Sequence, residues 1–282
     1  MLRLNFQGRH PGPVWLFAAD SLFTNETGYL VRSQYIKRMI ILAVFGAHWY
    51  LSLFTQTFFH HRYAAHKQFT MSKAWERFFY ILSWLFQGSS YLSPRAYGIM
   101  HRMHHAYADT DKDPHSPQYD SNFFAMMLRT RKVYNSIFDK VARIEKRFVK
   151  DLPEWRAFDL FASNNATRVS WILIYIMIYL AFDPSWWAYL LIPIHAVMGP
   201  FHGVIINWFA HEIGYRNFKV KDTSKNLMPI DILMLGEGLH NNHHKHAGRA
   251  NFGWKKWEFD PVYPLIWVLD RLKVIRLRRA AA

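Results

Sequence analysis

Residues 39–59 restrict most strongly how this chain can fold. The stretch MIILAVFGAHWYLSLFTQTFF contains no Asp, Glu, Lys or Arg, and Lys37, Arg38 and Arg62 flank it. A helix needs about 20 apolar residues to cross the hydrocarbon core of a bilayer. Only a helix satisfies the backbone hydrogen bonds of a single segment in lipid. The sequence therefore predicts a transmembrane helix at about residues 37–59.

A second membrane element is predicted at residues 168–209. VSWILIYIMIYLAF and the apolar stretch 186–209 are separated by Asp-Pro-Ser, which is typical of a tight turn. We therefore expect a transmembrane hairpin. Pro193, Gly199 and Pro200 are able to kink its second half.

The composition indicates a molecule that lies partly in the bilayer and partly in water. Aromatic residues make up 18% of the chain, as membrane interfaces favour. The mean hydropathy of −0.12 is too low for a bundle wholly in lipid. The net charge of +15 suits anionic lipid or an acidic partner, and no nucleic-acid motif accompanies it. The absence of Cys excludes disulfides and Cys-ligated metal sites, and we expect no signal peptide at the N-terminus.

The 16 histidines are concentrated in short motifs. HRMHH (101–105) and HNNHH (240–244) both place His at i, i+3 and i+4, offsets that share one helix face. Each triplet can therefore point three imidazoles toward one centre. His61 and His66 are five residues apart, which is not one face of a regular helix. We expect a helix end or a local distortion between them.

These histidines predict a metal site that holds two ions. With His211, the candidates are nine His and no Cys, which exceeds the four ligands of structural zinc and leaves a position open for chemistry. Imidazole suits Fe, Cu, Zn and Ni, so the ligand type alone leaves the metal open. Single histidines on apolar segments, such as His48, His195 and His202, are expected to be hydrogen-bonded core residues instead.

The metal site constrains the topology, because all its ligands must lie on one side of the bilayer. Residues 67–100 then cannot cross once, so 75–98 should lie along the interface or dip in and return. Segments 99–167 and 210–282 should be cytosolic, since Lys/Arg-rich segments favour that face. The predicted fold is one all-α integral membrane domain over 1–282. Three to four transmembrane helices are capped by a cytosolic helical domain that holds a His-rich dinuclear metal site.

The number of crossings before His61 stays open at this point. Residues 14–30 contain Asp20, Asn25 and Glu26 and make a poor crossing. Either they pack at the interface, or the N-terminus lies outside the cytoplasm.

The motifs together resemble the membrane-bound fatty acid desaturases, specifically their acyl-CoA desaturase-like (stearoyl-CoA desaturase type) branch. That family shows H-x4-H followed by two H-x-x-H-H boxes, as here at residues 61–66, 101–105 and 240–244. HAYADTDKDPH and NWFAHEIGYR also resemble segments of the family. Where the family often has a bulky aromatic before the third box, this chain has Leu239.

The resemblance implies a catalytic centre of two iron ions that uses O₂ as co-substrate. Its ligands would be nine histidines and one asparagine that acts through water: His61, His66, His101, His104, His105, His211, His240, His243, His244 and Asn207. The implied enzyme is an oxidoreductase acting on paired donors, with reduction of O₂ to water. It inserts a cis double bond into the acyl chain of an acyl-CoA or acyl lipid.

The resemblance also implies partners and a location. Electrons would come from a separate ferredoxin or cytochrome b5-like donor with its reductase, which the positive charge would attract if it is acidic. Membrane lipid is a further partner, and no nucleic acid is expected. The active site would face the cytosol at a bacterial inner membrane or an ER-type membrane.

Eight further residues are candidates for supporting roles. Asp109, Asp113, Glu212 and Glu237 lie near the motifs and are candidates to orient metal-bound His through the distal nitrogen. Contacts with the substrate, through phosphate or at the entrance, are expected from Arg62, Arg95, Arg102 and Trp75. Solvent, capping or lipid-headgroup roles remain open for all of them.

Two alternative functions remain at this point. One is a related membrane di-iron hydroxylase or ketolase acting on alkane, sterol or carotenoid substrates. The other is a non-catalytic metal carrier or sensor. The DTDKDPH and N-x-x-x-H segments favour the acyl desaturase.

Overall fold

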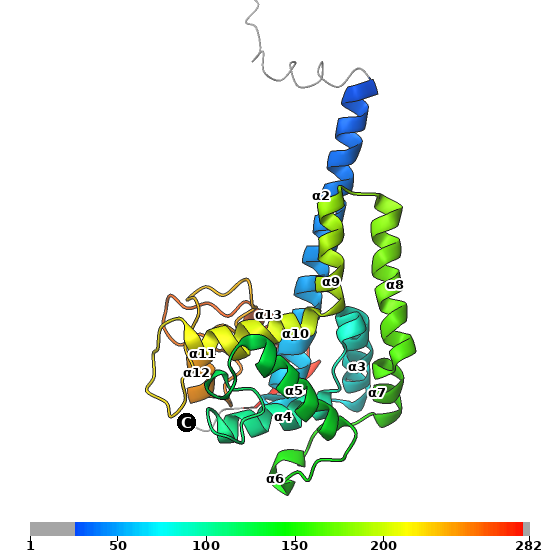
Figure 1. Cartoon of the computed structure of the whole chain (residues 1–282). Coiled ribbons are helices and arrows are strands. Elements are labelled where there is room, and N and C mark those ends of the chain that lie inside the picture. The colour runs from blue at the N-terminus through cyan, green and yellow to red at the C-terminus, as the bar shows by residue number, and fades with distance from the viewer. Residues whose placement is uncertain (1–25, 279–282) are drawn as a thin grey trace, which may run out of the picture.

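One long helix organises the molecule. The computed structural model describes residues 26–278, in which α2 (Glu26–Thr55) continues directly into the π-helix η1 (Gln56–Ala65). Figure 1 shows α2 rising out of the rest of the molecule, with α8 (Asn165–Phe182) and α9 (Leu191–Ala196) beside its lower portion and its upper end standing alone. Val31–Ala65 and Asn165–Phe182 are each long and apolar enough to cross a membrane. They contain the first predicted crossing and the whole apolar first half of the predicted hairpin, residues 169–182.

The second half of the hairpin is broken. It consists of the 3-10 helix η4 (Trp186–Leu190), α9, α10 (Met198–Val204), the π-helix η5 (Ile205–Phe209) and α11 (Ala210–Glu212). Trp186–Ala196 and Met198–Glu212 are bent by 79° relative to each other. The break lies at Val197, and Pro200 cannot donate the backbone hydrogen bond that a continuous helix would need.

The described residues therefore hold two helices able to cross a membrane, or three if the bent pair forms one span. This reaches only the lower end of the predicted three to four. Residues 14–25, on which the open question of an earlier crossing depends, lie outside the described part of the chain.

The predicted interfacial segment is divided as its sequence suggests. It contains α3 (Lys73–Gln87), the 3-10 helix η2 (Gly88–Ser90) and the start of α4 (Pro94–Tyr107). At 15 residues, α3 is too short to cross a bilayer alone. Ser72 caps α3 and Ser93 caps α4, each accepting a backbone N–H with its hydroxyl. The interfacial position itself stays a prediction.

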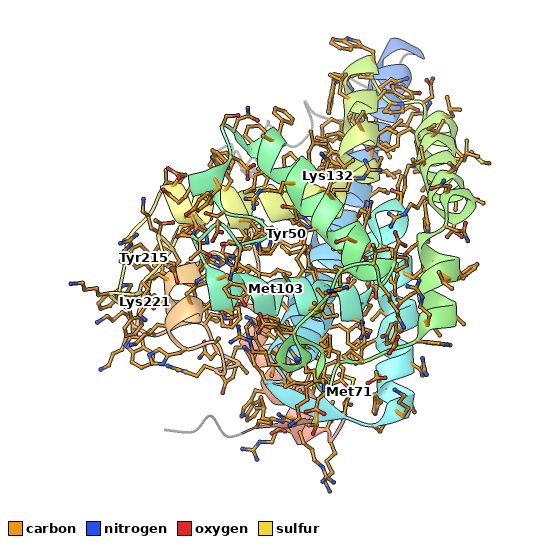
Figure 2. All side chains as sticks on the ribbon, turned by 60° about the horizontal axis from the view of Figure 1, so that its bottom comes forward. Tyr50, Met71, Met103, Lys132, Tyr215 and Lys221 are labelled. Atoms are coloured by element: carbon orange, nitrogen blue, oxygen red, sulfur yellow. The ribbon has the colours of Figure 1, made fainter. Side chains whose placement is uncertain are left out.

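The lower part of the molecule is built from short helices and long connections. These are the 3-10 helix η3 (Pro117–Tyr119), α5 (Phe123–Phe138), α6 (Lys146–Val149), α7 (Arg156–Ser163), α12 (His240–Lys245) and α13 (Val262–Arg271). Viewed from below, Met103 marks α4 near the centre, and Tyr215 and Lys221 mark the connection between α11 and α12 at one side (Figure 2).

A small sheet is the one departure from an all-α fold within the described residues. β1 (Phe69–Met71) pairs antiparallel with β2 (Ile275–Leu277), with Thr70 opposite Arg276. The basic C-terminal segment therefore returns to the core instead of forming a tail. Phe69 and Ile275 are buried in the aromatic cluster around Phe58 and Phe79, which provides the apolar contact that a two-stranded sheet needs.

Candidate metal centre

Nine imidazoles converge below the long helix in two adjacent groups. In the first group, one ring nitrogen from each of five histidines lies within 4.8 Å of the others: His61, His66, His101, His105 and His243. In the second, the same holds for His104, His211, His240 and His244. These are the nine histidines singled out from the sequence. The groups draw on η1, α4, α11 and α12, together with His66, which directly follows η1.

The Nε2 atoms are the ones that meet. In the first group, the Nε2 of His243 lies 2.9 Å from those of His61 and His105. In the second, the Nε2 atoms of His211 and His240 are 3.1 Å apart. The Nε2 atoms of His104 and His244 are 3.3 Å apart. Such spacing, with several Nε2 atoms aimed at one point, fits nitrogen ligands around a metal ion.

Each H-x-x-H-H triplet is divided between the two groups. On α4, His101 and His105 join the first group and His104 joins the second; on α12, His243 joins the first, and His240 and His244 the second. The expectation that a whole triplet points at one centre was therefore wrong. Residues four apart lie about 40° apart around a helix, whereas the residue at i+3 lies about 60° to the other side. One short helix thus serves both groups.

The helix carrying His61 is distorted where the sequence predicted a distortion. Gln56–Ala65 is a π-helix, and the backbone N–H of His66 donates to the carbonyl of His61 over 3.1 Å. A π-turn bonds residue i to i+5, so it brings together residues that a regular helix separates. His61 and His66 consequently reach the same group, with ring centroids 4.9 Å apart.

Carboxylates stand behind several of the imidazoles. The Nδ1 of His61 lies 2.6 Å from Glu237, and the Nδ1 of His104 lies 2.9 Å from Asp113. Asp109 lies 3.7 Å from the Nδ1 of His211 and accepts the hydroxyl of Thr223, whose oxygen is 3.0 Å from the same nitrogen. Carboxylates in this position fix the ring and its tautomer, leaving Nε2 free for a metal.

One predicted carboxylate differs, and one was missed. Glu212 is exposed, and its backbone carbonyl accepts from Lys225. Asp222 instead lies 3.0 Å from the Nδ1 of His244. Nothing in the local sequence singles out Asp222, because it lies in the long connection before α12, where only the fold sets its position.

Burial sets the protonation of the site. It lowers the pKa of His101, His105, His240 and His243 well below the usual value, and neighbouring imidazoles lower it further. These rings are therefore neutral and able to donate electron pairs. Burial acts in the same direction on His104, but the Asp113 carboxylate outweighs it and the pKa of His104 is raised.

Asn207 and His115 also lie at the site. Both line a cavity of about 40 Å³ beside the two groups, together with His61, His101 and His240. His115 could have been found from the sequence, since it ends the DTDKDPH segment. Its ring lies 4.4 Å from that of His104.

The four predicted substrate contacts lie in different surroundings. Arg62 is fully buried and pairs with Asp260 at 2.7 Å. Arg102 donates to backbone carbonyls, including that of Ala65 at 2.7 Å. Arg95 lies 3.3 Å from Glu154, and Trp75 is partly exposed on α3. Arg62 and Arg102 thus have partners within the protein, and a substrate role for the four stays a prediction.

Comparison of the sequence with known proteins identifies the family of the chain. The sequence profile described as Fatty acid desaturase matches residues 38–256, which include both histidine groups. The chain belongs to the fatty acid desaturase family.

Three relatives of this chain illustrate the similarity. It is 27% identical to the Delta-9 desaturase-like 2 protein of Arabidopsis thaliana, over 77% of this chain and 69% of the relative. It is 28% identical to the hex-5-enoyl-[acyl-carrier protein] acetylenase of Moorena producens, over 80% and 73%. With the sn-1 stearoyl-lipid 9-desaturase of Anabaena variabilis the identity is 27%, over 75% and 74%. Membership of the family implies an oxidoreductase.

Proposed function

We propose that this chain is a membrane fatty acyl desaturase that uses O₂ and two iron ions to insert a cis double bond into an acyl chain. The observation that most supports this proposal is that nine buried or half-buried imidazoles converge in two adjacent groups. Both groups lie directly below helices able to cross a membrane. Relatives named as desaturases support desaturation over hydroxylation or ketone formation.

The residues present fit two metal ions. Five imidazoles surround the position of one ion, and four surround the position of the other. Asn207 lines the cavity beside them. Glu237, Asp113 and Asp222 hold the distal nitrogens of one ring in the first group and two in the second. Bound iron would supply the oxidising power, drawn from O₂, that breaking an unactivated C–H bond requires.

The protein's own task is to position the acyl chain and exclude bulk water. Beside the two groups, the cavity has an apolar wall made by Leu53, Met100, Ile206 and Met234. Leu53 belongs to the long helix α2 and Ile206 to η5, so the wall continues the membrane-spanning part of the molecule. Methylene groups of an acyl chain that lay against this wall would be kept out of water.

The complete reaction requires partners. The substrate is an acyl-CoA or a lipid-linked acyl chain, and a ferredoxin or cytochrome b5-like protein with its reductase supplies two electrons. The net charge of +15 favours an acidic donor. The site would face the cytosol, with α8 and α9 in the membrane.

The proposal is tested by expressing the chain in a host that supplies an electron donor, and analysing the host lipids by gas chromatography with mass spectrometry. A new double bond supports it, whereas a new hydroxyl or keto group would indicate the related hydroxylase or ketolase. His104→Ala should abolish the product. His246→Ala is the matched control, because this neighbouring histidine belongs to neither group. Iron analysis of the purified protein should give two ions per chain.

A further inference from the structure

The cavity beside the imidazole groups also has a polar wall that the proposed ligands do not explain. Within residues 26–278, neither ring nitrogen of His202 has a hydrogen-bond partner, although the residue is only 1% exposed. The side-chain oxygen of Gln56 is buried and likewise has no partner in that part of the chain. Both residues line this cavity. The wall thus offers three polar atoms with no partner among the described residues.

His202 differs in this respect from the other lone histidines of the apolar segments. His48 and His195 are hydrogen-bonded to each other over 2.6 Å, and His195 is hydrogen-bonded to Tyr179 over 3.0 Å. These two behave as the hydrogen-bonded core residues that the sequence predicted. The indole of Trp49 packs edge-on against the ring of His202, with ring centroids 4.6 Å apart at 86°.

Leaving a buried polar group without a hydrogen bond costs about 1–3 kcal/mol of stability. Such atoms are therefore normally hydrogen-bonded to the protein or to an ordered water molecule. A water molecule needs roughly 10–15 Å³ of cavity and two to four polar partners. The cavity offers about 40 Å³ and the polar atoms of His202 and Gln56. Water therefore satisfies the size and the chemistry of the polar wall, while the apolar wall suits methylene groups.

We propose that His202 and Gln56 hold ordered water that delivers protons to the dinuclear site. This rests on the proposed function, whose balance is R–CH₂–CH₂–R′ + O₂ + 2 e⁻ + 2 H⁺ → R–CH=CH–R′ + 2 H₂O. Two C–H bonds and the O–O bond break, the C=C bond forms, and the separate donor supplies the electrons. Two protons must therefore reach the site in each reaction cycle. A short chain of fixed water can carry them without exposing the acyl chain to solvent.

The placement of the two residues supports this role. Gln56 begins η1, the helix that carries His61, and His202 lies on α10, just before the π-helix that contains Asn207. Gln56 thus shares its element with a residue of the centre, and His202 lies on the element that directly precedes one. His202 and Gln56 act as positioning residues for water, and neither belongs to a ligand group.

The test replaces the imidazole by an apolar side chain of similar size, His202→Leu. We expect kcat to fall about tenfold or more with KM little changed, and the solvent deuterium isotope effect on kcat to rise. His202→Gln, which can still bond water, should recover most of kcat. His195→Leu removes a buried histidine outside the cavity and should leave the isotope effect at its wild-type value. If His202→Leu does not fold, Gln56→Met tests the same wall.

A structural measurement provides a readout independent of turnover. A high-resolution map of the zinc-loaded wild-type protein should show water between His202 and Gln56, and the map of His202→Leu should lack it. The inference would be overturned by a wild-type map with no water between His202 and Gln56, or by an unchanged solvent isotope effect in His202→Leu. These failures are distinct from failure of the proposed function, in which the wild-type chain itself would form no double bond.

Discussion

At the scale of single residues, the partners behind the imidazoles decide how well the centre is organised. Glu237, Asp113 and Asp222 each lie within 3.0 Å of an Nδ1 atom, and the last of them was invisible in the sequence. A carboxylate in this position raises the basicity of the ring and fixes its orientation. Substitution of one of these carboxylates should therefore change metal affinity without removing a ligand.

Asp222→Asn should weaken metal binding in the second group while leaving the first intact. His244 would lose its carboxylate partner, and such losses typically reduce metal affinity about 10- to 100-fold. Chelator competition followed by metal analysis measures this directly. Asp139→Asn is the control, since Asp139 is exposed at the end of α5. Equal retention of both ions in Asp222→Asn and wild type would contradict the assignment.

Asp159 gives a prediction for pH dependence away from the metal centre. Burial raises the pKa of Asp159 to about 6, against hydrogen bonds from Tyr91 and Ser93 that lower it. Because the folded-state pKa lies above the unfolded value of 3.8, the folded state binds more protons between these values. The stability contributed by protonated Asp159 is present below pH 3.8 and is lost as pH rises through about 6.

The wild-type protein should therefore lose stability relative to Asp159→Asn between pH 4 and pH 7. The expected change is about 1–3 kcal/mol, since one pKa unit corresponds to about 1.4 kcal/mol. Thermal unfolding of both proteins in detergent across this range measures the difference. Parallel curves for the two proteins would show that Asp159 does not titrate as described.

At the scale of elements, short interruptions aim the helices. The π-helix η1 brings His66 to His61, and the break at Val197 turns Met198–Glu212 by 79°, so that it carries His211 toward the centre. A third interruption, at Gly88, ends α3 and allows the chain to return into α4. In each case a departure from regular helix, and not the helix itself, sets the direction of a ligand.

Gly88→Ala should destabilise the protein, because Gly88 has a φ of +54° and an added Cβ would lie 1.8 Å from the hydroxyl of Tyr175. Backbone strain and overpacking together suggest a loss of about 2–4 kcal/mol. The thermal midpoint in detergent is the measurement. Gly46→Ala in α2 is the matched control, because an added Cβ there meets nothing within 4 Å. It should be neutral or slightly stabilising, as Ala favours helix.

At the scale of the whole molecule, the elements that carry the nine imidazoles gather at the lower end of the long helix, whereas the turn between α8 and α9 lies partway up that helix (Figure 1). The segments between the ligands therefore return to the same end. The small β1–β2 sheet closes this end by joining the segment after His66 to the C-terminal part of the chain. This arrangement keeps all the metal ligands on one side of the membrane, as a single metal centre requires.

The absence of native cysteine allows a direct test of this topology. Lys132→Cys in α5 and Lys221→Cys in the connection before α12 should react with an impermeant thiol reagent only from the cytosolic side. Ser185→Cys, in the turn between α8 and α9, should react only from the opposite side. Labelling of sealed membrane vesicles of both orientations is the measurement. Labelling of Lys221→Cys and Ser185→Cys from one side would contradict the predicted crossings.

The sequence by itself determined the nine imidazoles, the first crossing, and the distortion between His61 and His66. Each follows from local physics: the length of an apolar helix, the spacing of residues on a helix face, and the poor fit of a five-residue interval to a regular turn. Family membership was equally visible, because ligand identity and order along the chain carry it.

Only the tertiary structure decided which imidazole serves which group, that Asp222 supports His244, and that Arg62 is buried against Asp260. It also left the ring of His202 without a hydrogen-bond partner in the described part of the chain, while it joined His48 to His195. These outcomes depend on the relative rotation of packed helices and on long connections. Residues far apart in the chain set those quantities together, so no local pattern records them.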